Sequence, residues 1–101
     1  MKNVDTLIYE ILAEEILIED VLDAMLQLDD PIGRMKGLIK GFDKVVFSNP
    51  QFGEAYRNRG MAKLKLSEIL PAFENPGAIT LDAIHDLQTS SGLPLRNDRF
   101  I

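Results

Sequence analysis

Residues 42–66 read FDKVVFSNPQFGEAYRNRGMAKLKL, and this stretch decides the fold class. Up to residue 46, apolar side chains recur at three- and four-residue spacings, the pattern of an amphipathic helix. That helix is expected to end at Ser48-Asn49-Pro50, because the residue before a proline avoids helical backbone angles. A second helical pattern starts near Phe52 and runs to about Leu70. The stretch therefore predicts two helices joined by a tight turn.

The helix before this turn is expected at about residues 31–47. Asp30 can cap its first turn, and Pro31 suits a first helical position because its missing N–H needs no partner there. Gly37 and Gly41 lie one turn apart, and each costs about 1 kcal/mol relative to alanine. We therefore expect the two glycines to permit a close contact with another helix. The apolar face of this helix holds Met35, Leu38, Ile39, Phe42, Val45 and Val46.

Residues 4–28 show helical periodicity without any glycine or proline, and they predict one long amphipathic helix. Asp5 or Asn3 can cap its start, because a short polar side chain accepts hydrogen bonds from first-turn amides. The apolar stripe loses phase at residues 14–18, so a bend is expected there.

The C-terminal part opens with Asn75-Pro76-Gly77, a strong turn signal. A shorter fourth helix is expected at about residues 80–90, with Thr80 as its cap and Gly92 as its stop. Residues 93–101 show no periodicity, and we expect an irregular tail that docks through Leu95, Phe100 or Ile101. No segment alternates apolar and polar residues over the length of a strand. The predicted fold class is all-α, with about four helices.

The 101 residues suffice for one domain, and 46% of them are apolar, enough for a packed core. The chain has no cysteine, which excludes disulfides and thiolate sites and fits a reducing compartment. No stretch approaches the roughly 20 apolar residues that a membrane span needs, and the start lacks the form of a secretory signal. These features predict a cytoplasmic protein with no membrane partner.

The net charge of −5 is distributed unevenly. Residues 1–33 hold one basic and nine acidic residues, a net charge of −8. Residues 34–66 hold eight basic and two acidic residues, a net charge of +6. The two segments could pair within one chain or between two copies, or they could be ordinary solvated helix faces.

Candidate catalytic and metal-binding groups are few. His85 is the only histidine, and neither a cysteine nor a serine in a glycine elbow accompanies it or its neighbours Asp82 and Asp86. We therefore predict that the chain is not an enzyme and holds no cofactor or metal. The acidic overall charge argues against nucleic-acid binding. The acidic residues of the first segment are read as a solvated face: Glu14, Glu15, Glu19, Asp20 and Asp23.

The junction around Pro50 resembles that between two tetratricopeptide repeats, where one helix ends at a proline and the next carries aromatic and small residues. Phe42 holds the aromatic position four residues after Leu38, and Pro50 falls eight residues later. Tyr56 stands where the family often has tryptophan, followed by Gly60. The resemblance covers about residues 38–66, with a weaker match at 80–90.

The sequence departs from the repeat pattern at several places. Arg59 stands where leucine is usual, and Lys63 stands where a tyrosine is expected. About eleven extra residues lie between Ser67 and Asp82, relative to the period of roughly 34. Residues 4–28 do not match a first repeat helix. The domain plan is therefore an acidic N-terminal helix (1–30), repeat-like helices with an insertion near 67–82 (31–92) and a tail (93–101).

The resemblance implies antiparallel helical hairpins and a protein-interaction module. Its third helix would present the partner-binding surface, and Arg57, Asn58 and Lys65 would hold an acidic or carboxylate-bearing peptide. The full set implied for partner binding is Glu54, Arg57, Asn58, Met61, Leu64 and Lys65.

A second function is compatible with the sequence: a compact acidic helical inhibitor or regulator of one basic partner protein, as in immunity proteins. The two hypotheses place the binding surface differently. The module predicts that Arg57→Ala or Lys65→Ala weakens capture of the partner. The acidic regulator predicts that reversing Glu14, Glu15 and Glu19 does so, while Arg57→Ala changes little.

A repeat module this short leaves apolar faces uncovered, because about three repeats are usually needed for stability. Either the first helix caps the pair from within, or two chains cover each other. We predict a homodimer, because the apolar residues of the first helix extend over more than one narrow stripe. Light scattering after size exclusion should give twice the mass of one chain, and a monomer at every concentration would contradict this prediction.

Overall fold

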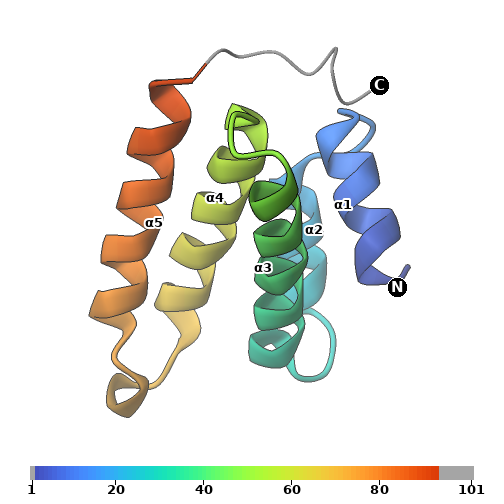
Figure 1. Ribbon diagram of the computed structural model, residues 1–101. Helices are drawn as coiled ribbons and strands as arrows, with labels where there is room; N and C mark the ends of the chain where they lie inside the picture. Colours follow the sequence, from blue (N-terminus) through green and yellow to red (C-terminus); the bar gives the residue numbers. More distant parts are fainter. Residues whose placement is uncertain (1, 94–101) are drawn as a thin grey trace.

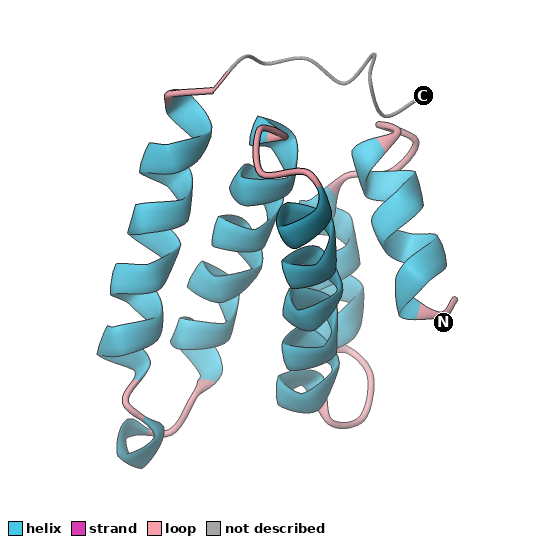
Figure 2. Cartoon of the chain, in the orientation of Figure 1, coloured by secondary structure: helices cyan, strands magenta, loops and turns pink. Residues whose placement is uncertain are grey.

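The computed structural model describes residues 2–93, and over that range the fold is all-helical, as the sequence predicts (Figures 1 and 2). There are five α-helices in this range rather than about four, and no strand. In chain order the elements are α1 (Val4–Leu12), α2 (Ile18–Leu26), α3 (Pro31–Ser48), α4 (Gly53–Ile69), the 3₁₀ helix η1 (Ala72–Glu74) and α5 (Pro76–Ser91). The expected tail residues Leu95, Phe100 and Ile101 lie outside the described range.

Helix α4 occupies the middle of the arrangement, where it packs against α5, α3 and α2. Helix α3 packs in turn against α1 and α2. Figure 1 shows α5 at one edge of the molecule and α1 at the other. The main partner of α5 is therefore α4 alone.

The single helix expected at residues 4–28 is wrong, because the chain breaks between α1 and α2. Glu14 adopts a left-handed conformation, with φ at 63°. The Glu15 amide donates to the Glu10 carbonyl and the Glu14 amide to the Ile11 carbonyl, the two bonds of a Schellman motif. This motif ends α1 at Leu12, just before residues 14–18, where the apolar stripe loses phase.

The start of α3 agrees with the prediction made from the sequence. Asp30 is the cap, and its carboxylate accepts a hydrogen bond of 3.0 Å from the Gly33 amide. At the other end, the Phe52 amide donates to the Asn49 carbonyl, and the Tyr56 hydroxyl donates to the Pro50 carbonyl. These bonds fix the tight turn between α3 and α4.

Helix α5 begins earlier than expected, because Asn75 rather than Thr80 is its cap. The Asn75 side chain accepts from the Ala78 amide, and Pro76 occupies the first turn. The Asn-Pro-Gly sequence is therefore a helix start as well as a turn. Residues expected as an insertion between helices contribute the first turn of α5.

The hydrophobic core is shared by the first four helices. Its buried members are Leu7, Ile8, Ile11, Leu12, Ile18, Val21, Leu22, Met25, Met35, Leu38, Phe42, Phe52, Ala55, Ala62, Leu66 and Leu70. Full burial of each large side chain contributes about 1.5–3 kcal/mol. Helix α5 buries only Ala83, Asp86 and Ser90, so it depends on other contacts.

Two glycines set the closest helix approaches. A Cβ on Gly41 would collide with the Ile8 side chain and come within 2.9 Å of Val4, so α1 lies directly on α3. A Cβ on Gly60 would lie 3.0 Å from the Ala83 carbonyl oxygen, so α5 also packs closely against α4 at this position. The close contact expected at Gly37 is wrong, since the nearest atom is 4.0 Å from its Cβ position and a side chain has room there.

Within the described residues, none of the helices combines the length and apolarity that a membrane span requires.

The two glycines of α3 should respond in opposite ways to substitution. Gly41→Ala should lower the free energy of unfolding by about 1–2 kcal/mol, because overpacking outweighs the gain in helix propensity. Gly37→Ala should raise it by up to about 1 kcal/mol through helix propensity alone. Urea denaturation of both variants measures the difference, and equal effects would contradict the packing of α1 on Gly41.

Candidate functional site

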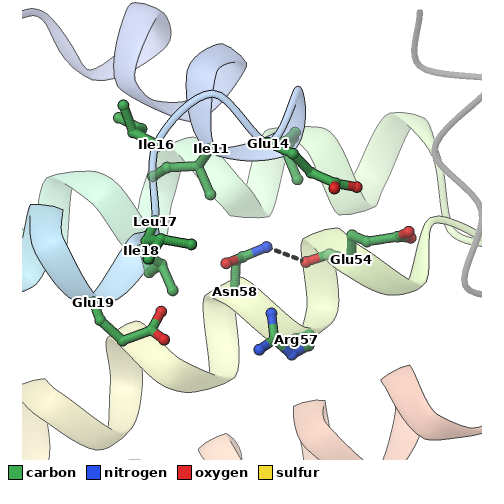
Figure 3. A pocket seen from close by; sticks show the side chains of 10 residues that line it. Ile11, Glu14, Ile16, Leu17, Ile18, Glu19, Glu54, Arg57 and Asn58 are labelled. Atoms are coloured by element: carbon green, nitrogen blue, oxygen red, sulfur yellow. Dashed lines mark hydrogen bonds between the residues drawn. The ribbon is translucent and has the colours of Figure 1, made fainter.

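A pocket of about 480 Å³ opens between the α1–α2 connection and the first turns of α4 (Figure 3). Apolar side chains from the connection and its flanking helices form one wall, and polar side chains of α4 form the other. The lining residues are Ile11, Leu12, Glu14, Ile16, Leu17, Ile18, Glu19, Glu54, Arg57 and Asn58.

The break between α1 and α2 creates the first wall. A continuous helix would carry residues 13–17 along the surface, whereas the Schellman motif turns them back across α4. Leu17, 61% exposed, lies at the rim of the pocket. It is also the N-cap of α2, yet no side-chain hydrogen bond caps that helix.

The α4 wall is held by a hydrogen bond within the helix. The Asn58 side-chain amide donates to the Glu54 carbonyl over 2.7 Å, the dashed line in Figure 3. Asn58 is only 5% exposed, and its Oδ1 accepts no hydrogen bond from the described residues. The Glu54 Oε1 atom is buried and likewise lacks a hydrogen-bond partner.

Among the described residues that line the pocket, three are glutamates and one is an arginine. Arg57 is exposed, and it makes no ion pair within residues 2–93. Most of the other cations of the central segment do pair: Arg34 with Asp29, Lys36 with Glu74, Lys65 with Glu68, and Arg59 and Lys63 with Asp86.

The structure divides the six residues predicted for partner binding. Glu54, Arg57 and Asn58 come together at the pocket. Met61 instead packs against the hydrophobic core, and Lys65 pairs with Glu68 at 3.3 Å. Leu64 is half-buried and does not line the pocket.

The apolar wall was not predicted as part of the site. The sequence pattern assigns Ile11, Leu12 and Ile18 to the apolar stripe of one long helix, and Glu14 and Glu19 to a solvated face. Ile16 and Leu17 fall where that stripe loses phase. The one sequence signal was the loss of phase at residues 14–18, which coincides with the wall. That signal indicates a break, but not which helix the broken segment covers.

A network of ion pairs joins α5 to the rest of the fold. The Asp86 carboxylate, with its side chain 3% exposed, accepts two hydrogen bonds from Arg59, at 2.7 and 2.8 Å. Lys63 lies 3.1 Å from the same carboxylate, and Arg59 also donates to Asp43 of α3 at 2.9 Å. Arg59 and Lys63 are two positions at which the sequence departs from the repeat pattern.

The network shifts the protonation of its members. Burial raises the pKa of Asp86, but the hydrogen bonds and charges of Arg59 and Lys63 outweigh it, so that pKa lies below its ordinary value. The hydrogen bonds that Arg59 donates to Asp86 likewise raise the pKa of Arg59. Asp86 is therefore ionised in the folded state.

The network also bears on catalysis and metal binding. Because Arg59 and Lys63 bind the carboxylate of Asp86, it is not available to orient the neighbouring His85, which is exposed. No group of three or more histidine, aspartate or glutamate side chains placed to hold a metal ion occurs within residues 2–93. The pocket is thus the principal candidate site.

Comparison of the chain with protein-family models, with curated proteins and with solved structures found no match.

The Asp86 network predicts a pH dependence of stability. The pKa of Asp86 in the folded state lies below its unfolded value of about 3.8. The contribution of Asp86 to the free energy of unfolding is therefore complete above that value and is lost as the pH falls through the folded pKa. At neutral pH, Asp86→Asn should lower the free energy of unfolding by about 3 kcal/mol, since it breaks a buried pair. The difference in free energy of unfolding between the variant and the unsubstituted chain should disappear below pH 4.

Asp29→Asn is the matched control for this measurement. The pKa of Asp29 is also lowered, through its hydrogen bond with Arg34, but its side chain is 89% exposed. Stability should therefore hardly change in this variant. A gap for Asp86→Asn that stays constant down to the acid transition would contradict the role of the carboxylate.

Proposed function

We propose that the chain is a protein-interaction module of tetratricopeptide-like type, which holds a short segment of a partner protein in the pocket between the α1–α2 connection and α4. The observation that carries this proposal is the convergence of two independent surfaces. Glu54, Arg57 and Asn58, chosen from the repeat resemblance, line the same pocket as an apolar wall that the resemblance did not include.

The composition of the pocket supports binding. Binding sites are commonly concave and mostly apolar, with a few polar groups that fix orientation. Here five apolar residues face Arg57, which has no ion-pair partner within residues 2–93, and two acceptors of α4. Glu54 Oε1 is buried without a hydrogen-bond partner, and Asn58 Oδ1 accepts no hydrogen bond from the described residues. A partner segment would bury the apolar rim and supply the missing hydrogen bonds.

We propose binding rather than catalysis, because the pocket holds no histidine, cysteine or serine to act as base or nucleophile. A cytoplasmic location belongs to the same proposal and rests on the cysteine-free sequence.

Self-association is part of the proposal as well. Exposed large apolar side chains occur away from the pocket: Phe47 is 89% exposed, Phe73 87% and Leu81 69%. Leu81 and Ile84, which is 43% exposed, lie three residues apart on an exposed face of α5. A second copy could cover this face, as the next helix pair does in a repeat array.

The acidic regulator remains a second candidate, supported by one observation. Glu15, Glu19, Asp20 and Asp23 are exposed and form no ion pair within the described residues. A basic partner could therefore bind this surface through charge complementarity.

Leu17→Ser should separate binding from stability. It removes the apolar rim of the pocket, so the affinity for peptides selected from a random library against the unsubstituted chain should fall at least fivefold. The same change should raise the free energy of unfolding by about 0.5–1 kcal/mol, because serine can cap α2. Calorimetric titration and urea denaturation measure the two effects.

Leu81→Ser is the matched control, because Leu81 is similarly exposed but lies on α5 outside the pocket. It should leave peptide affinity unchanged. The acidic regulator predicts the opposite pattern: reversal of Glu15 and Asp23, which do not line the pocket, would abolish binding, while Leu17→Ser would not. That result would overturn the pocket as the binding site.

A further inference from the structure

We infer that the partner segment carries one lysine or arginine among apolar residues, and that Glu54 and Asn58 bind this basic residue. The inference deepens the proposed function and rests on it, since it names the chemistry of the segment that the pocket holds. The repeat resemblance implies an acidic peptide, and the inference replaces it with a segment that carries a basic residue.

The first argument is the state of Glu54. Its Oε1 atom is buried without a hydrogen-bond partner, so part of the carboxylate has lost water and gained nothing in exchange. No ion pair within residues 2–93 compensates its charge. A cationic group of a ligand would offset this unfavourable desolvation, whereas an anionic group would increase it.

The second argument is the orientation of Asn58. Its amide nitrogen is committed to the Glu54 carbonyl, and this directs Oδ1 toward the apolar wall in Figure 3. Only 5% of this residue is exposed, yet the oxygen accepts no hydrogen bond from the described residues. The pocket therefore offers a second acceptor, which suits an N–H donor of the ligand.

The third argument is the balance of charge around these two acceptors. Glu19 also lines the pocket, and like Glu54 it forms no ion pair within residues 2–93. Lys65, expected to attract an acidic peptide, is paired with Glu68 and lies outside the lining. The local field thus favours a cation.

Arg57 limits how many basic residues the segment can carry. Among the described lining residues it is the one cation, and it lies next to Asn58 on α4. A second basic residue bound nearby would be repelled by its guanidinium. The five apolar lining residues instead suit apolar neighbours on both sides of a single basic residue.

Three peptides of one design test the inference. Each is a terminally blocked heptapeptide with leucines around a central residue, which is lysine, glutamine or glutamate. Affinities come from nuclear magnetic resonance titrations that follow the Asn58 side-chain amide. The lysine peptide should bind about tenfold more tightly than the glutamate peptide, with the glutamine peptide between them. Equal affinities, or a preference for glutamate, would overturn the inference.

Glu54→Gln should reduce the preference for lysine over glutamate to about threefold or less, because it removes the charge and keeps the shape. Glu68→Gln is the control, since it removes the same charge from α4 outside the pocket, and it should preserve the preference. A preference that survives Glu54→Gln would overturn the assignment of Glu54.

Failure of the inference and failure of the proposed function give different results. If all three peptides shift the Asn58 amide without a preference for lysine, the pocket binds peptides but the inferred basic residue is wrong. If none shifts it, while library peptides also ignore Leu17→Ser, the pocket is not a peptide site and the proposed function fails with it.

Discussion

A buried carboxylate is the constraint on which the C-terminal half of this fold depends. Asp86 lies on α5 with its side chain 3% exposed, and an unpaired charge at such a position would destabilise the fold by several kcal/mol. Arg59 and Lys63 satisfy it from α4, and Asp43 draws Arg59 toward α3. Because α5 buries no large apolar side chain, this network and the close contact at Gly60 replace the core packing that holds the other helices. One network thereby fixes α4 relative to both of its long neighbours, and α4 carries half of the pocket.

The other half of the pocket depends on a break in the chain. Helix α1 is held on α3 by the contact at Gly41, and α2 packs against α3 and α4. The short connection between α1 and α2 therefore passes over the first turns of α4, where Ile16 and Leu17 form the apolar wall together with residues of the flanking helices. The pocket is a consequence of how two rigid helices are joined, and both of its walls are positioned by packing that lies outside it.

The parts of the fold that could be predicted from the sequence are those governed by local rules. The cap at Asp30, the turn at Pro50 and the close approach at Gly41 follow from residue types that have few alternatives at such positions. The break after Leu12 could not be located, because Glu14 adopts a left-handed conformation that usually requires glycine or asparagine. The Asp86 network was hidden for a different reason. Arg59 and Asp86 are 27 residues apart, and a charged side chain in a helix is normally read as solvated. Three of the six predicted binding residues line the pocket, since α4 was identified correctly, but the residues that face them belong to the misread segment.

The same connection contains two residue choices that lower stability. A left-handed glutamate costs roughly 1 kcal/mol of stability relative to glycine. Leucine at the N-cap of α2 costs about 1 kcal/mol relative to serine, because leucine cannot accept a hydrogen bond from the first-turn amides. Helices α1, α3 and α5 use the good capping residues Asn3, Asp30 and Asn75, whereas α4, like α2, begins without a side-chain cap. The α1–α2 connection is the place where an uncapped helix start and a left-handed glutamate occur within four residues. Both Glu14 and Leu17 line the pocket. Residues that break local rules tend to gather where a protein binds or reacts, because selection there acts on function rather than on stability. The occurrence of both unfavourable choices in the connection that forms the apolar wall therefore supports the proposed binding site, on grounds independent of its shape and charge.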